Sequence, residues 1–98
     1  MDLIEQTADG TDKTQARGIT RIYAHGTDLV RVRVHRDFYK DQSYAVAEVM
    51  SSDRKWTDLT HAPREQWWEY TRNPQCGLAV VADDLAKRAA KILDAVAR

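Results

Sequence analysis

The 98-residue sequence lacks the features that mark membrane proteins, disulfide scaffolds and secreted chains. No apolar run approaches the roughly 20 residues that a membrane-spanning helix needs, which argues against a membrane protein. The single cysteine, Cys76, has no second cysteine with which to form an internal disulfide, and this favours a reducing compartment. No charged-then-apolar leader opens the sequence, so we expect a cytoplasmic protein.

The sequence also lacks motifs that commit a chain to catalysis. It has no glycine-rich phosphate loop and no GxSxG motif, and Cys76 has no CxxC partner. No two of His25, His35 and His61 have the spacing of metal ligands on a helix. We therefore expect a protein that is not an enzyme, with no catalytic residues, no cofactor and no metal.

Net charge is absent as well, because 15 Lys and Arg balance 15 Asp and Glu. This balance argues mildly against nucleic-acid binding, since nucleic-acid-binding domains are usually basic. The length allows one domain, and 43% hydrophobic residues suffice for a core. Residues 1–17 have no apolar pattern and are acidic at their start, so we predict a flexible acidic tail over 1–17 and a single α+β domain over 18–98.

Residues 29–35 are the clearest strand, because Val30, Val32 and Val34 alternate with Arg31, Arg33 and His35. Strict alternation predicts one buried face and one solvent-exposed, cationic face. Residues 19–25, 43–50 and 55–59 are further predicted strands, joined by short polar segments. Strands this close in sequence favour a three- or four-stranded antiparallel meander.

The register of the first hairpin is open from the sequence. A two-residue loop places Arg21 and Tyr23 on the valine face, whereas a three-residue loop places Ile22 and Ala24 there. We prefer the three-residue loop, because it buries no charge.

Two helices are predicted after the strands. Pro63 suits the first position of a short helix that carries Trp67 and Trp68 and ends before Pro74. Residues 78–81 are either a short strand or the lead-in to a final helix that starts near Asp83. Its apolar stripe, which we expect to cover the valine face, consists of Leu85, Ala89, Ile92, Leu93 and Val96.

The candidate binding residues lie on the cationic strand and the short helix. Arginine forks suit phosphates and acidic protein surfaces, and exposed tryptophans are common interface anchors. An ordinary solvated strand face and an ordinary core edge are the alternatives. The candidates are Arg31, Arg33, His35, Arg36, Trp67 and Trp68.

The leading hypothesis is a non-enzymatic protein-binding module that docks to another protein or forms a homodimer through a free edge strand or the tryptophan surface. A nucleic-acid-binding domain is the alternative, with the same arginines and with Tyr23, Tyr39 and Tyr44 as stacking groups.

Two resemblances bear on these hypotheses. Residues 18–68, especially LVRVRVHRDFYKDQSYAVAEV at 29–49, resemble small uncharacterised proteins encoded by actinobacteria, their phages and mobile elements. That resemblance implies an accessory factor that modulates or inhibits a host protein. AKRAAKIL at 86–93 is similar to the final helix of double-stranded RNA-binding domains, which implies phosphate contacts for Lys87, Arg88 and Lys91. The sequence departs from that family by lacking its first helix.

Overall fold

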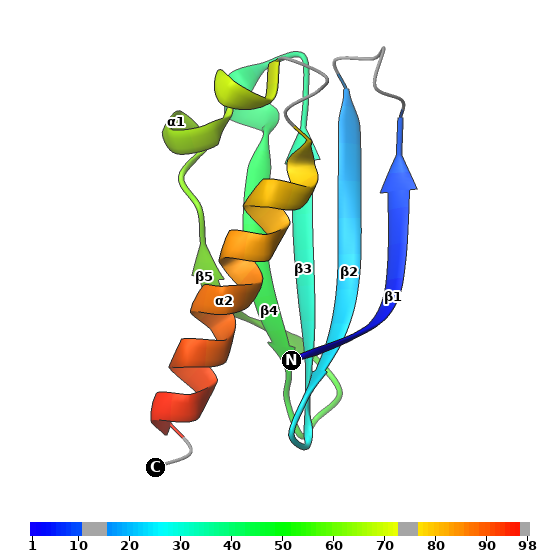
Figure 1. Ribbon diagram of the computed structural model, residues 1–98, viewed down its shortest axis with the longest axis vertical. Helices are drawn as coiled ribbons and strands as arrows, with labels where there is room; N and C mark the ends of the chain where they lie inside the picture. Colours follow the sequence, from blue (N-terminus) through cyan, green and yellow to red (C-terminus); the bar gives the residue numbers. More distant parts are fainter. Residues whose placement is uncertain (11–15, 73–76, 97–98) are drawn as a thin grey trace.

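A five-stranded antiparallel sheet with one long helix across one face makes up the fold, as Figure 1 shows. The computed structural model describes residues 1–10, 16–72 and 77–96. The strands follow one another in sequence order: β1 (Asp2–Asp9), β2 (Arg17–His25), β3 (Asp28–Arg36), β4 (Tyr44–Met50) and β5 (Trp56–His61). The helical segments are η1 (Lys40–Gln42), α1 (Arg64–Trp67), η2 (Tyr70–Arg72) and α2 (Leu78–Val96). The predicted α+β class is confirmed, with one strand more than the highest number expected.

The additional strand replaces part of the predicted acidic tail. Residues 2–9 form β1, which pairs antiparallel with β2 and places Thr7 opposite Thr20. The tail prediction was wrong here because every β1 residue is exposed, so no apolar pattern marks the strand. Its order comes from backbone hydrogen bonds to β2, which hydropathy does not report. Residues 11–15 of the predicted tail lie outside the described residues.

The β2–β3 hairpin closes with the two-residue loop Gly26 and Thr27, because His25 pairs with Asp28. Gly26 adopts a φ of 61°, a conformation that a two-residue hairpin loop requires. The preferred three-residue loop was therefore wrong, and Tyr23 lies opposite Val30 on the valine face. Arg21 shares that face at little cost, because its guanidinium contacts the Tyr23 hydroxyl and Asp83 of α2.

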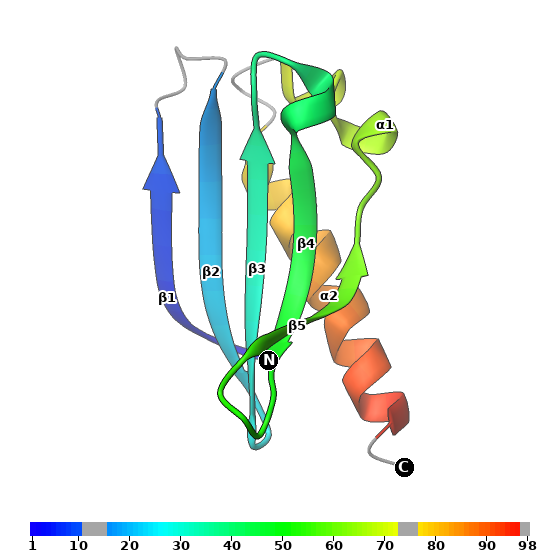
Figure 2. The same cartoon turned by 180° about the vertical axis from the view of Figure 1, so that it is seen from behind.

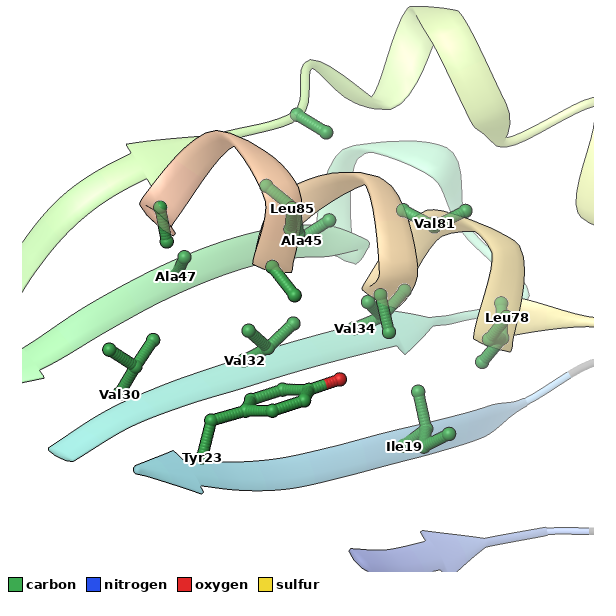
Figure 3. Packing of buried hydrophobic residues seen from close by; sticks show 14 of the residues in the cluster. Ile19, Tyr23, Val30, Val32, Val34, Ala45, Ala47, Leu78, Val81 and Leu85 are labelled. Atoms are coloured by element: carbon green, nitrogen blue, oxygen red, sulfur yellow. The ribbon is translucent and has the colours of Figure 1, made fainter. Parts of the chain in front are cut away.

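The core lies between the valine face and α2. Val30, Val32 and Val34 are fully or almost fully buried, and Leu85 of α2 is fully buried over them. Figure 3 shows Tyr23 and Ile19 of β2 beside these valines, with Leu78 and Val81 of α2 above the sheet. The expected packing of the terminal helix on this face is therefore confirmed. Arg31, Arg33 and His35 consequently point away from α2.

Helix α2 begins at Leu78, so the apolar run at 78–81 is its first turn and not a strand. The predicted start near Asp83 was too late, because Asp83 and Asp84 lie beyond that first turn. Both carboxylates have side-chain partners: Asp83 contacts Arg21, and Asp84 pairs with Arg88 at 2.7 Å. The predicted apolar stripe is buried at Leu85 and Ala89 but emerges toward its end, where Val96 is 79% exposed.

The short tryptophan-bearing helix is confirmed as α1 followed by η2, beside one end of the sheet. Trp67 is buried in the core, and its Nε1 donates a hydrogen bond to the Ala62 carbonyl at 3.1 Å. Trp68 is half-buried against the core. Within the described residues, no helix combines the length and apolarity required to cross a membrane.

Candidate binding surface

The face of the sheet opposite α2 is open, and its centre carries the cationic residues of β3. Figure 2 shows this face, with no helix lying over β2 or β3. Register places Arg31 opposite Glu48, Arg33 opposite Val46 and His35 opposite Tyr44 on β4. Cross-strand partners share a face, so these β4 side chains lie beside the arginines. We call the set Arg31, Arg33, His35, Tyr44, Glu48 and Trp56 the open-face ladder.

Glu48 is the hub of the open-face ladder. Its Oε1 accepts hydrogen bonds from Nε of both Arg31 and Arg33 at 2.9 Å, and its Oε2 accepts one from Nη2 of each at 3.1 Å. The carboxylate is thus held by two forked donors, which is a strong, geometrically specific arrangement. Glu48 is only 4% exposed, and the two arginines shield it from solvent.

The charge state of Glu48 follows from two opposing effects. Burial acts to raise the pKa of this carboxyl group, while the hydrogen bonds from Arg31 and Arg33 act to lower it. The combined effect of the two arginines is larger than that of burial, so the pKa of Glu48 lies below its usual value. Glu48 is therefore ionised at neutral pH and neutralises one of the two arginine charges.

Aromatic rings flank the arginines. The guanidinium carbon of Arg31 lies 4.5 Å from the centroid of the Trp56 ring, and that of Arg33 lies 5.7 Å from the Tyr44 ring. The His35 and Tyr44 ring centroids are 5.5 Å apart, with the rings tilted by 31°. Cations against aromatic faces attract the ring quadrupole, so these contacts fix the arginines in place.

His35 is held from the loop side by Asp37, whose Oδ2 lies 3.2 Å from His35 Nε2. The Asp37 carboxylate also accepts a hydrogen bond from the Tyr39 backbone N–H at 3.2 Å. That backbone bond, followed by the His35 contact, lowers the pKa of Asp37. The loop after β3 is thereby tied to the open-face ladder.

A groove of about 570 Å³ adjoins the ladder over β4 and β5. Arg33, Tyr44 and Val46 line its sheet side, and His61 and Arg64 line the side nearer α1. Arg64 donates hydrogen bonds to the carbonyls of Lys40 and Asp41 and so fixes α1 against η1. A second hollow beyond Arg64 is lined by Phe38 and Tyr39, which are both exposed.

Arg36, Trp67 and Trp68 lie on the opposite side of the sheet from the ladder. Arg36 lies two residues after Val34, so it points to the valine face, where it is fully buried. Its guanidinium carbon lies 4.4 Å from the centroid of the Trp68 ring. Its Nε donates to Thr71 Oγ1 at 3.2 Å. Burial, followed by the nearby charges of Arg17 and Arg72, lowers the pKa of Arg36. The predicted site residues therefore form two groups separated by the sheet, and the second group packs η2 onto the domain.

The sequence analysis did not single out Glu48 or Trp56 as site residues. Alternation along residues 44–50 places Glu48 on the same face as Tyr44, but pairing it with the arginines requires the β3–β4 register. Trp56 reaches Arg31 because β5 pairs with β4 and places Trp56 opposite Met50. Only the register across three strands brings these groups together.

The histidines do not converge. His25 lies at the hairpin end of β2, where its Nε2 is 2.7 Å from Asp94 Oδ1. His35 lies near the opposite end of β3, and His61 is exposed at the end of β5. Among the described residues, which do not include Cys76, no group of three His, Cys, Asp or Glu is placed to hold a metal ion.

No protein-family model, curated protein or solved structure matches the chain. What the surface can do therefore follows from its own chemistry. It offers hydrogen-bonded arginine groups packed against aromatic rings, beside a groove.

Proposed function

We propose that the protein is a non-enzymatic binding module that docks another protein on the open face of its sheet. The observation that carries this proposal is the open-face ladder, in which Glu48 holds two arginines against aromatic rings. Groups already fixed in the free protein lose little conformational entropy on binding. Arginine and aromatic residues are also the ones that contribute most to protein interfaces.

The exposed half of the ladder is the half beside the groove. The Arg33 side chain is 37% exposed, whereas that of Arg31 is 24% exposed beneath Trp56. Tyr44 is exposed next to Arg33, and Phe38 and Tyr39 extend the surface past Arg64. We infer that Arg33 and Tyr44 form the centre of the interface and that the Phe38–Tyr39 loop forms its rim.

The charge on this face favours a protein partner over a nucleic acid. Glu48 cancels one arginine charge, and Asp58 lies opposite Glu48 on β5. A phosphate backbone attracts uncompensated cations, so this partial neutralisation weakens the nucleic-acid alternative. The resemblance to phage and mobile-element accessory proteins agrees with a cytoplasmic host protein as the partner.

The test compares two double variants of matched composition. Arg33→Ala/Tyr44→Ala removes one arginine and one tyrosine from the open face, while Arg72→Ala/Tyr70→Ala removes the same pair from exposed positions of η2. The proposal expects a partner that cross-links to the wild-type protein to be lost from the first variant and kept by the second. Equal loss from both variants, or from neither, would contradict it.

Salt dependence separates a protein partner from a nucleic acid. Fluorescence anisotropy with mixed DNA and RNA oligonucleotides at low salt should show no saturable binding. Binding that weakens steeply as salt rises, because phosphates release counterions, would instead support the nucleic-acid alternative.

A further inference from the structure

The two edges of the sheet differ in how far their backbone is available to another strand. β1 is hydrogen-bonded to β2 on one side, and no described strand lies along its other side. Helix α2 packs across β2, β3, β4 and β5, and Figure 1 shows β1 standing clear of it. β5, the other edge, is contacted by α2 and soon followed by Pro63.

Features that usually protect an edge strand are scarce on β1. Natural proteins shield exposed edges with charged side chains, above all lysine, or with proline, very short strands or bulges; the charges on β1 are all acidic, so they repel an acidic strand but not a basic one. Residues 1–10 contain no Lys, Arg or Pro, and β1 is eight residues long. A single bulge lies between Leu3 and Glu5, and regular pairing continues from Glu5 to Asp9. Such an edge is a template for strand addition, in which main-chain hydrogen bonds provide affinity.

The side chains of β1 determine which strand would fit. Register places Glu5 opposite Ile22, Thr7 opposite Thr20 and Asp9 opposite Gly18, so all three point to the open face. Within the described part of the chain, neither Glu5 nor Asp9 forms an ion pair. Asp2, opposite Ala24, also points to this face and forms no ion pair with any described residue. The edge therefore presents three uncompensated carboxylates beside its unpaired backbone, of which Glu5 and Asp9 lie four residues apart in the regularly paired segment.

We propose that β1 accepts, as a sixth strand, an extended segment of another protein that carries Lys or Arg at two positions four residues apart. Residues four apart in a strand point to the same face and lie about 13 Å apart, which matches Glu5 and Asp9. Opposite charges on directly opposed strand positions stabilise the pairing. This surface is separate from the open-face ladder and does not depend on the function proposed for it.

A second copy of the chain is a poorer occupant of this edge. Antiparallel pairing of β1 with itself, centred on Thr7, would place Glu5 of one copy opposite Asp9 of the other. Like charges on opposed positions destabilise a sheet. The acidic edge therefore selects a basic strand from a different protein.

The test uses a fluorescein-labelled peptide with the core Lys-Val-Thr-Val-Lys and the wild-type protein. A second peptide, Lys-Val-Pro-Val-Lys, has the same charge, but proline prevents regular strand pairing. The proposal expects saturable binding of the first peptide by fluorescence anisotropy, much weaker binding of the second, and amide chemical-shift changes centred on β1. Equal binding of both peptides, or no binding of the first at millimolar concentration, would overturn it.

Charge reversal provides the second arm. Glu5→Lys/Asp9→Lys alters only exposed side chains and should weaken binding of the first peptide on the order of tenfold or more. Glu65→Lys/Glu69→Lys reverses the same number of exposed carboxylates near α1 and should leave binding unchanged. A similar loss in both variants would indicate nonspecific attraction and contradict the proposal. A concentration-dependent dimer of the wild-type protein in sedimentation, with amide chemical-shift changes along β1 as it forms, would show that a second copy occupies this edge and would also overturn it.

Discussion

Both faces of the sheet hold arginine side chains partly or wholly out of water, but their partners have different origins. On the covered face, Arg21 reaches Asp83 of α2, and Arg36 lies against Trp68 after α1. On the open face, Arg31 and Arg33 are held by Glu48 of the adjacent strand. The covered-face contacts therefore require the helices to dock, whereas the open-face ladder is assembled by the sheet alone.

This difference bears on what each face can do. A covered-face arginine is committed to joining two parts of the fold, and any change in its contacts alters the docking of a helix. The open-face arginines are positioned by strand register, so a partner could bind them without disturbing α2. Pre-organised groups of this kind suit recognition.

The largest expected effect tests how far the covered face depends on α2. Leu85→Ala removes a fully buried side chain between the helix and the valines, and should lower the free energy of unfolding by about 3 kcal/mol. Val96→Ala, at the exposed end of the same helix, is the control and should change it by less than about 0.5 kcal/mol. Urea denaturation measures both. Equal effects would mean that α2 is not held through its buried stripe.

The next effect concerns the open face. Glu48→Gln keeps the shape of the side chain but removes the charge that holds Arg31 and Arg33 together. We expect a loss of about 2 kcal/mol, less than for a fully buried ion pair because both arginines reach solvent. Glu65→Gln, an exposed carboxylate, is the matched control for urea denaturation. An unchanged stability in Glu48→Gln would show that the ladder is an incidental surface contact.

The pH dependence of stability also tests the contribution of the ionised Glu48, and its expected effect is smaller. Because the pKa of Glu48 is lower in the folded protein than the usual 4.5, the unfolded chain binds a proton first as the pH falls. The stabilisation is therefore complete above the usual carboxyl pKa and is lost as the pH falls through the lowered folded value. Urea midpoints measured across this acidic range should fall more steeply for the wild type than for Glu48→Gln. Parallel profiles would assign the acid sensitivity to other carboxylates.

Sequence reasoning succeeded where alternation was strict and failed where it had to judge a single charge. The valines at 30, 32 and 34 predicted the covered face, and the same alternation carried one step further places Arg36 there too. The hairpin register was predicted wrongly because we expected the charged Arg21 side chain to face solvent. In the folded chain, Tyr23 and Asp83 supply its partners, and Asp83 lies 62 residues away in sequence.

The candidate site was predictable only in part. The outward direction of Arg31, Arg33 and His35 follows from the period of β3, and the burial of the alternating valines beneath α2 confirms it. Their attachment to Glu48 does not follow, since it depends on register with β4. β1 was missed because a fully exposed polar strand has no hydropathy pattern, and its position is determined by backbone pairing with β2.

The smallest effect is expected on the covered face. The last prediction compares its Arg21–Asp83 ion pair with the Arg33–Glu48 ion pair of the open face. Asp83 is 61% exposed, and Arg21 keeps its contact with the Tyr23 hydroxyl when Asp83 is neutralised. Asp83→Asn should therefore lower the free energy of unfolding by less than about 1 kcal/mol. A double-mutant cycle of Arg21→Met with Asp83→Asn, measured by urea denaturation, should give a smaller coupling than a cycle of Arg33→Met with Glu48→Gln. A larger coupling on the covered face would reverse the comparison, because the stronger ion pair would then be the one that joins the helix to the sheet.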